Sequence, residues 1–535
     1  MKNSYNIFIV GILIFQFSFS SVELPIGFTD KELTMKHLIK NVGNQTDPPQ
    51  MPIRNIAEFE RMHGVLIRYP FGISTALIKE MADDVVVYCL VSSSYQSSAY
   101  NSMFNAGVNM NNVEFILGST DSYWTRDYGP WWVVDGDRNI SIVDFTYNRP
   151  RFNDNAAPSK VSNYLGAPYF SADFISTGGN YMTNGYGVSA GTHIAYTENN
   201  ECNTNDEWSV PLAPCDYVDD IMENYYGINK NHIVADPNNE YIDHIDCWGK
   251  FLSFNKILIR DVPSSHPQHD ELDDIANYFS KQTTLDNVPF EIYRVYTPDD
   301  QPYTNSLILN EKVLVPITNS SWDDDALDVY AAAMPGYEIL GFTGSWQSTD
   351  ALHCRVKGIP DLEMIQILHN PISNQLEPLD SYKIIANIDD LGNQGLNNDA
   401  LKVIWWNSEE NYQELPLSDC SNDNFENCYE AFIPGQPYDG TINYFIYVEN
   451  NIGKIETYPI AGYFTFDYVG GDPLEDGDVN LDGSINILDV VVIVNFVLGT
   501  DVPDVYQLQI ADINDDSIIN ILDIIMLVNI ILGGK

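Results

Sequence analysis

From about residue 50 to residue 365, short apolar runs typical of strands alternate with segments of helical periodicity. The runs at 85–90 and 256–259 are rich in Val, Ile and Leu, which favours buried strands. The stretches 270–279 and 325–333 have helical spacing and stand next to such strands. This alternation predicts an α/β domain whose candidate catalytic residues lie at strand ends and in loops.

Helical periodicity disappears between about residues 366 and 468, where runs such as 442–448 alternate with turns rich in Gly, Asn, Pro and Asp. A segment of about 100 residues with this pattern predicts a small β-sandwich of the immunoglobulin-like kind. With 535 residues, the chain is too long for a single core. We expect an α/β domain at 21–365, the sandwich at 366–468 and a third module at 469–535.

The third module contains an internal duplication, in which the segment 478–489 is repeated at 512–523. Oxygen-bearing side chains at the first, third, fifth, ninth and twelfth positions of each copy have the spacing of a loop that wraps around Ca²⁺. The predicted ligands are Asp478, Asn480, Asp482, Asn486 and Asp489 in the first loop and Asp512, Asn514, Asp516, Asn520 and Asp523 in the second. Ser517 stands where glycine usually makes the sharp turn, so the second site is expected to be weaker. The alternative is a chance cluster of turn-forming residues, which two copies in register disfavour.

The formal charge of −49, from 26 basic and 75 acidic residues, excludes some classes of partner. It argues against nucleic acid, whose phosphates require cationic neutralisation, and against an anionic membrane surface. It favours solubility, cationic partners and metal cations.

The N-terminus has the pattern of a secretory signal at 1–20. Lys2 precedes an apolar stretch at 7–19, and Ser18-Phe19-Ser20 fits a cleavage site. A membrane anchor is the alternative, but the stretch is short and has no stop-transfer flank. We therefore expect a secreted protein, extracellular or associated with the cell surface, without membrane insertion after signal cleavage.

Export permits disulfides, and the cysteine count of seven leaves at least one thiol unpaired. Two pairs close in sequence are expected to form local bridges: Cys202 with Cys215, and Cys420 with Cys428. Cys89 and Cys247 lie in strand-like runs and are interpreted as buried thiols or a third pair. Cys354 is then the natural free thiol.

Five residues of the α/β segment provide the groups needed to attack a guanidinium carbon: Cys354, His244, Asp246, Asp127 and Asn305. Carboxylates can orient the cation, a thiolate can add to its carbon, and a histidine can protonate the departing ammonia and then activate water. His244 and Asp246 would face the same side of an extended strand. Each residue taken alone is more often structural, so the functional interpretation depends on their joint occurrence.

These residues fall in motifs that together resemble the guanidino-group-modifying superfamily, or penteins, and most closely its bacterial peptidylarginine deiminase and agmatine deiminase branch. The motifs are Trp-Thr-Arg-Asp-Tyr-Gly-Pro at 124–130, Thr-Gly-Gly-Asn at 177–180, His-Ile-Asp at 244–246, Thr-Asn at 304–305 and His-Cys at 353–354. The resemblance implies a five-bladed pseudo-symmetric α/β propeller with the site at its centre. It also implies Cys354 as nucleophile and His244 as general acid/base, without a catalytic cofactor. Asp127 and Asp246 would hold the guanidinium, and Asn305 would support the reacting centre.

Two arginines, Arg149 and Arg151, favour a peptide substrate over agmatine. A peptide ending in arginine has a carboxylate that guanidinium groups bind well, whereas agmatine has none. The resemblance places Trp124 and Tyr241 at further substrate-contact positions. An exposed basic turn is the alternative for the arginine pair.

The duplicated segment resembles the type I dockerin module, which implies structural Ca²⁺ and a cohesin-like partner docked on its helices. The predicted function is a secreted cysteine-dependent deiminase that converts arginine residues of peptides or proteins, preferably C-terminal ones, to citrulline and ammonia through a covalent thiouronium intermediate. The first alternative is an agmatine deiminase, which export disfavours. The second is a non-catalytic scaffold or adhesion protein that acts through the dockerin-like module.

Overall fold

The computed structural model describes residues 24–39, 45–199, 202, 208–238, 242–407, 411–421, 427–471, 476–514 and 516–533. The chain divides into two compact units, Met1–Leu362 (unit 1) and Glu363–Lys535 (unit 2). The predicted signal at 1–20 lies outside the described residues. Within the described ranges, none of the helices has the length and apolar character needed to cross a membrane.

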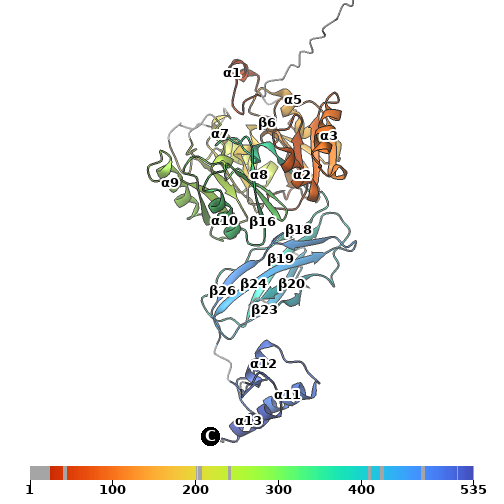
Figure 1. The fold of residues 1–535 in the computed structure, drawn as a ribbon, viewed down its shortest axis with the longest axis vertical. Helices are drawn as coiled ribbons and strands as arrows, with labels where there is room; N and C mark the ends of the chain where they lie inside the picture. The colour runs from red at the N-terminus through yellow and green to blue at the C-terminus, as the bar shows by residue number, and fades with distance from the viewer. Residues whose placement is uncertain are drawn as a thin grey trace, which may run out of the picture. The chain divides into compact units, whose positions relative to one another are not determined.

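Unit 1 is built from short strands and helices in alternation (Figure 1). Its strands are β1 Arg54–Asn55, β2 Met62–Arg68, β3 Val86–Val91, β4 Val113–Leu117, β5 Trp131–Val134, β6 Ile140–Tyr147, β7 Tyr169–Ser176, β8 Met182–Thr183, β9 Val188–Thr192, β10 Lys230–Val234, β11 Gly249–Phe251, β12 Lys256–Asp261, β13 Glu291–Tyr296, β14 Leu307–Leu309, β15 Lys312–Ile317, β16 Glu338–Thr343 and β17 Lys357–Pro360. Its α-helices are α1 Asp30–Met35, α2 Thr75–Asp84, α3 Gln96–Asn105, α4 Thr125–Tyr128, α5 Phe152–Asn155, α6 Ala157–Leu165, α7 Ile194–Thr197, α8 Asp216–Tyr226, α9 His269–Phe279 and α10 Asp323–Ala333. Its 3₁₀ turns are η1 Lys36–Leu38, η2 Met110–Asn112, η3 Gly178–Asn180, η4 Ile245–Cys247 and η5 His353–Arg355.

The described strands of unit 1 form five small sheets, ordered β1-β5-β6-β7, β10-β9-β8, β11-β12-β13, β14-β15-β16 and β17-β2-β3-β4. Each sheet contains a parallel pair whose connection includes a helix, as in β12–α9–β13 and β15–α10–β16, together with an antiparallel neighbour. The α/β prediction is therefore confirmed. None of these sheets closes on itself within the described residues, and the five-bladed propeller remains a prediction.

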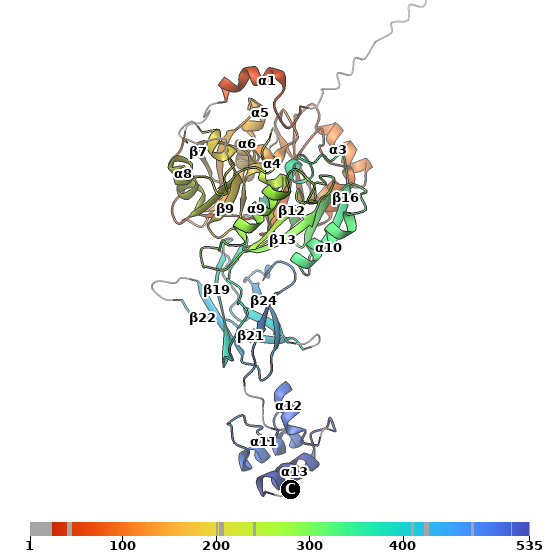
Figure 2. The same cartoon turned by 90° about the vertical axis from the view of Figure 1, so that its left-hand side faces the viewer.

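Helix α9 illustrates how the sequence produces these layers. Leu272, Ile275, Ala276 and Phe279 recur at helical spacing and are buried, and they belong to a core shared with β12 and β15. The helix carries acidic residues in its first turn, which favours its N-terminus. Figures 1 and 2 show α3, α9 and α10 on the outside of the unit. The outer helices therefore pack on strands that form the interior of the unit.

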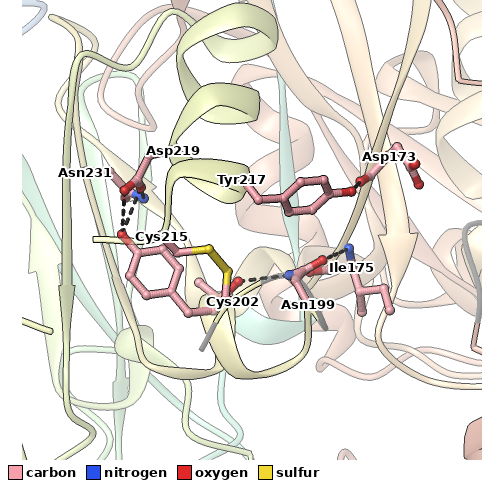
Figure 3. Close-up of a disulfide and its surroundings, with 10 residues drawn as sticks. Asp173, Ile175, Asn199, Cys202, Cys215, Tyr217, Asp219 and Asn231 are labelled. Carbon is pink, nitrogen blue, oxygen red and sulfur yellow. Dashed lines mark hydrogen bonds between the residues drawn. A yellow bond between two sulfur atoms is a disulfide. The ribbon is translucent and has the colours of Figure 1, made fainter. Parts of the chain in front are cut away.

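Both predicted local disulfides are present, Cys202–Cys215 and Cys420–Cys428, while Cys89 and Cys354 are buried thiols. Figure 3 shows the first bridge next to Asn199, which donates from Nδ2 to Ile175 O (3.0 Å) and accepts the Ile175 N–H at Oδ1 (2.9 Å). These contacts hold the start of α8 and the end of α7 against β7. A bridge of this loop length typically stabilises a fold by about 3 kcal/mol.

Unit 2 begins with two antiparallel sheets, ordered β18-β19-β23-β22 and β21-β20-β24-β25, with β26 also paired to β24. The strands are β18 Ile365–Leu368, β19 Ser381–Asp390, β20 Lys402–Trp406, β21 Gln413–Pro416, β22 Ser418–Asp419, β23 Cys428–Pro434, β24 Gly440–Glu449, β25 Ile455–Tyr458 and β26 Phe464–Tyr468. Alternate residues of β19 and β24 are buried in one core to which both sheets contribute, as expected for strands with one face turned inward. Figure 2 shows the two sheets packed face to face, which confirms the predicted sandwich layers.

The rest of unit 2 is helical, with α11 Ile487–Leu498, α12 Val505–Ala511 and α13 Ile521–Ile531 around a small apolar core. Asn486 and Asn520 cap α11 and α13 with the same capping box, closed by Asp489 and Asp523. The sequence duplication is therefore repeated in the local structure.

Candidate functional site

Cys354 lies in the 3₁₀ turn η5, which Asn305 holds from the loop before β14. Asn305 donates from Nδ2 to Cys354 Sγ (3.2 Å) and accepts the backbone N–H of Cys354 at Oδ1 (3.3 Å). Its backbone oxygen accepts the N–H of His353 (3.0 Å). One asparagine therefore fixes both the backbone and the sulfur of the thiol residue, and a donor aimed at sulfur favours its anionic form.

Asp246 is the carboxylate in contact with the thiol. Its Oδ2 lies 3.5 Å from Cys354 Sγ and 2.7 Å from His353 Nδ1. The backbone oxygen of Asp246 accepts from Asn305 Nδ2 and Thr304 Oγ1, both at 3.4 Å. The two motifs 244–246 and 304–305 thus meet at the cysteine.

The prediction that His244 and Asp246 share an extended strand is wrong. His244 is the N-cap of η4, and a 3₁₀ bond from Cys247 N to His244 O (3.2 Å) closes the turn. Asn180 holds this turn, because its Oδ1 accepts the N–H groups of Ile245 (3.2 Å) and Thr192 (2.9 Å). Tertiary hydrogen bonding has replaced the local extended preference.

His244 and Asp127 face each other at a distance too long for a hydrogen bond, with Nδ1 and Oδ1 3.6 Å apart and each side chain 1% exposed. Among the residues that the structure describes, neither ring nitrogen of His244, nor Asp127 Oδ1, nor Trp124 Nε1 has a hydrogen-bond partner. Buried polar atoms are nearly always paired, so a group of unpaired ones marks a place prepared for a ligand.

The surroundings of Gly179 explain why the motif at 177–180 has glycine at this position. A Cβ atom at Gly179 would lie 2.4 Å from His244 Nδ1 and 2.6 Å from Asp127 Oδ1. Any side chain would therefore displace the histidine or the carboxylate, and glycine permits the close approach.

Burial and like charges set the protonation of the site. Burial and Asp246 raise the pKa of Asp127 well above its usual range, and burial lowers the pKa of His244 to about 4. Burial, Asp246 and Asp127 raise the pKa of Cys354 well above its usual range. Burial also disfavours ionised Asp246, but the hydrogen bond and charge of His353 outweigh it and lower the pKa of Asp246. A cation between the two carboxylates would favour the thiolate.

Glu58 links the site to a buried charged network. Its carboxylate is hydrogen-bonded to His353 Nε2 (2.6 Å) and Lys250 Nζ (2.7 Å). It also forms an ion pair with Arg126 NH2 (2.7 Å). Burial, Arg126 and Lys250 lower the pKa of His353, and Glu58 and Asp246 offset only part of that effect. Both ring nitrogens nevertheless face carboxylate oxygens that can only accept when ionised, and this geometry favours the imidazolium.

Arg149 and Arg151 are buried, with 4% and 2% of their surface exposed, so the alternative of an exposed basic turn is wrong. The Arg151 guanidinium lies over the Trp124 ring, 5.3 Å from its centroid. Both arginines bind the segment 25–32 of the same chain. Tyr241, the remaining predicted substrate contact, lies outside the described residues.

A cavity of about 60 Å³ lies on the side of Asp246 and His353 that carries the charged network. Its lining includes Glu58, Arg126 and Lys250 but not Cys354 or His244. A space of this size with several charged side chains in its lining can hold a few water molecules. It is therefore distinct from the place where His244 and Asp127 face each other.

Sequence reasoning gave no role to Glu58, His353 or Gly179. His353 and Gly179 lie inside motifs that were recognised, so their positions were available as signals. Glu58 lies outside the recognised motifs, and its role follows from contacts with residues far away in the sequence.

The two duplicated loops have matching internal hydrogen bonds. Asp478 accepts the N–H groups of Asp482 (3.2 Å) and Gly483 (2.9 Å), and Asp512 accepts those of Asp516 (3.1 Å) and Ser517 (2.6 Å). Asp489 and Asp523 each accept from the third and ninth loop positions. Ser517 has φ +64°, where the first loop has Gly483 at φ +79°. The all-oxygen donor set suits Ca²⁺, although no group of three acidic, His or Cys side chains in the described residues is gathered to hold an ion.

The profile of the Porphyromonas-type peptidyl-arginine deiminase family matches residues 72–360, and that of the type I dockerin domain matches residues 476–532. Agmatine deiminase of Medicago truncatula is 23% identical over 297 residues, which cover 45% of this chain and 77% of that protein. The solved structure of agmatine deiminase of Enterococcus faecalis covers 60% of this chain and 99% of its own, with 16% identity and a TM-score of 0.50.

The first profile spans more than half of the sequence, so the chain belongs to the Porphyromonas-type peptidyl-arginine deiminase family and carries a type I dockerin domain after the sandwich. The structural likeness shows that unit 1 has the fold of the agmatine deiminases. Family and relatives together point to a deiminase of guanidino groups, a hydrolase of C–N bonds.

Proposed function

We propose that the protein is a secreted deiminase that converts peptidyl arginine, preferably at the C-terminus of a peptide, to citrulline and ammonia. The observation that carries this proposal is the set of buried polar atoms of Asp127 and His244 that have no hydrogen-bond partner among the described residues, close to a thiol that contacts Asp246. A guanidinium supplies donors for Asp127 and for the unprotonated ring nitrogen of His244, and a positive charge beside the carboxylate.

In the proposed reaction, Asp127 and Asp246 hold the guanidinium, and its charge favours transfer of the Cys354 proton to His244. The sulfur anion, supported by Asn305, adds to the guanidinium carbon. A C–N bond breaks, and His244 protonates the nitrogen that leaves as ammonia, which yields a thiouronium. Water then adds to that carbon while His244 accepts one of its protons. The C–S bond breaks as the carbonyl forms, the remaining hydroxyl proton passes to the departing sulfur, and citrulline is released; His244 then returns its proton to solvent.

Arg149 and Arg151 are the proposed site for the carboxylate of a C-terminal arginine, next to Trp124. The relatives named as agmatine deiminases favour the alternative substrate agmatine, which has an amine at that end. Ammonia release from agmatine, free arginine, arginine-ended peptides and their amides separates the two. Higher kcat/KM for agmatine than for every arginine-ended peptide would reject the peptide proposal.

Cys354→Ala is the direct test of the chemistry. It should abolish ammonia release while the far-ultraviolet circular dichroism stays unchanged; the unfolding midpoint should fall only modestly, because the buried donor of Asn305 loses its partner. Arg151→Gln should reduce kcat/KM for arginine-ended peptides much more than for their amides. An equal loss on both would remove the carboxylate site, and retained activity in Cys354→Ala would remove the nucleophile.

The remaining parts of the proposal concern the architecture. The five sheets of unit 1 would be the blades of a pentein propeller spanning 21–365, and the sandwich at 366–468 would be immunoglobulin-like. The module at 469–535 would hold Ca²⁺ through the ten predicted loop residues and bind a cohesin-like partner outside the cell. Since the catalytic groups are all side chains of unit 1, EDTA should lower the stability of the terminal module without changing the deimination rate.

A further inference from the structure

Residues of the segment 25–32, which follows the predicted signal, bind both Arg149 and Arg151. Arg151 donates to Glu32 from Nε (Oε1, 2.7 Å) and from NH2 (Oε2, 3.3 Å). The same NH2 donates to the backbone oxygens of Pro25 (2.6 Å) and Gly27 (2.9 Å). A carboxylate and two peptide carbonyls thus already take the Nε–NH2 edge that a substrate carboxylate would use, whereas NH1 has no partner among the described residues.

Arg149 is engaged by the same segment. Its Nε donates to the backbone oxygen of Ile26 (3.2 Å), and its guanidinium lies over the Phe28 ring, 4.4 Å from the centroid. Lys36 lies over the same ring at 4.5 Å. Consecutive residues of one segment therefore contact both arginines.

Apolar packing places the segment at the site as well. Ile26 is 3% exposed and belongs to the core cluster that contains Trp124 and Cys354. Both ribbon views show α1 beside α5, which follows directly after Arg151 (Figures 1 and 2). The segment is thus seated among the residues assigned to substrate recognition.

Glu32 has a second role that keeps the segment in shape. Its carboxylate accepts the N–H of Thr29 (2.8 Å), while Thr29 Oγ1 accepts the N–H of Glu32 (3.2 Å), a capping box at the start of α1. Burial disfavours the ionised form, but Arg151 and Thr29 outweigh burial and lower the pKa of Glu32. The helix start and the ion pair with Arg151 therefore depend on one side chain.

We propose that residues 24–32 are an internal ligand of Arg149 and Arg151, which a peptide ending in arginine must displace to place its carboxylate on Arg151. This inference rests on the proposed function. The apparent affinity for the peptide is the intrinsic affinity multiplied by the fraction of molecules in which the segment has left the arginines. Because coupling is reciprocal, bound peptide in turn drives the segment away from the arginines.

Steady-state kinetics of full-length Glu32→Gln test the inference. The substitution keeps the shape of the side chain but removes the charge that binds Arg151, so KM for an arginine-ended peptide should fall about fivefold or more while kcat is unchanged; fivefold corresponds to an occupied fraction of about four-fifths. Asp30→Asn, an exposed carboxylate of the same helix, is the matched control and should leave KM unchanged. Phe28→Ala removes the stacking on Arg149 without touching Glu32 and should lower KM in the same direction.

Hydrogen exchange of full-length Cys354→Ser provides a readout that does not need turnover. Adding an arginine-ended peptide should accelerate amide exchange in residues 24–32, whereas the same peptide with an amidated C-terminus should do so much less. Unchanged KM in both Glu32→Gln and Phe28→Ala, or exchange that the peptide does not accelerate, would overturn the internal ligand. Absence of ammonia release by every chain on every substrate would instead reject the proposed function.

Discussion

Two buried histidines, His244 in unit 1 and His369 in the sandwich of unit 2, have the same burial and opposite surroundings. They are 1% and 2% exposed, and burial lowers the pKa of each to about 4. In His369, Nδ1 bonds Ile385 O (2.7 Å) and Nε2 bonds Tyr444 Oη (2.8 Å). Among the described residues neither nitrogen of His244 has a hydrogen-bond partner.

The contrast separates a structural histidine from a functional one. A paired, buried polar group stabilises and specifies a fold, whereas an unpaired one costs free energy that the rest of the fold has to offset. The free energy cost at His244 is understandable if the ring and Asp127 acquire partners when substrate binds. Burial and pKa are thus equal in the two histidines, and hydrogen-bond satisfaction is the property that differs.

The largest expected effect is on turnover. His244→Gln should lower kcat by roughly 10²–10⁴-fold, the usual contribution of a general acid and base, whereas His369→Gln should leave kcat and KM unchanged. Ammonia release from one arginine-ended peptide measures both. A large loss of kcat in a properly folded His369→Gln, or none in His244→Gln, would break the comparison.

Acid should destabilise both units. Each histidine has a folded pKa of about 4 against about 6.5 when unfolded, so between these values the unfolded chain binds more protons. The contribution of each histidine to the unfolding free energy is therefore fully present above pH 6.5 and is lost as the pH falls toward 4. By pH 4 the loss is up to about 3 kcal/mol for each histidine.

Urea unfolding at pH 7, 5.5 and 4 tests this, with the transitions of the two units followed separately. His369→Gln should reduce the loss of unfolding free energy of unit 2 between pH 7 and pH 4 and leave that of unit 1 unchanged. His244→Gln should have the opposite effect on the two units. If neither substitution changes the pH dependence of the unfolding free energy of its own unit, the two histidines are not buried in the neutral form.

Two buried tyrosines test the same comparison away from the candidate site, because the hydroxyl of one is hydrogen-bonded and that of the other is not. Tyr444 Oη contacts His369 and accepts the N–H of Ile372 (3.0 Å), whereas Tyr226 Oη is buried without a partner among the described residues. Tyr444→Phe should lower the unfolding free energy of unit 2 by about 1–3 kcal/mol, since it leaves buried partners unsatisfied. Tyr226→Phe should leave the unfolding free energy of unit 1 unchanged or raise it. Comparable losses of unfolding free energy in the two variants would contradict the idea that hydrogen-bond pairing decides the effect.

The sequence pointed to residue types for the candidate site but not to the geometry that brings them together. Cys354 and Asn305 lie in motifs, and the contacts between them follow the expectation that they share a site. The turn at His244 depends on the distant Asn180, and Glu58 joins the network through contacts with Lys250 and His353. Local periodicity contains no information about such long-range contacts.

The arginine pair shows the same limit. From the sequence, Arg149 and Arg151 were expected to bind the carboxylate of a substrate, and that expectation stays a prediction. The structure has Arg151 bound to Glu32, a carboxylate of this chain, and Arg149 bound to the backbone oxygen of Ile26. The contact joins residues that are 119 positions apart, between Arg151 and Glu32. It depends on α1 lying beside α5, which no pattern in either segment indicates.

The smallest expected effect concerns the thiol. Burial, Asp246 and Asp127 raise the pKa of Cys354, so Asp127→Asn, which removes one of the two carboxylates, should lower that pKa. Because Cys354 is buried, the ultraviolet absorbance of the thiolate, with Cys354→Ala as the blank, is the measurement, and its titration should move to lower pH. Asp137→Asn, an exposed carboxylate between β5 and β6, is the control and should not move the titration. If Asp127→Asn leaves the titration unchanged, the sulfur does not sense that carboxylate, and a guanidinium bound to Asp127 could not activate it.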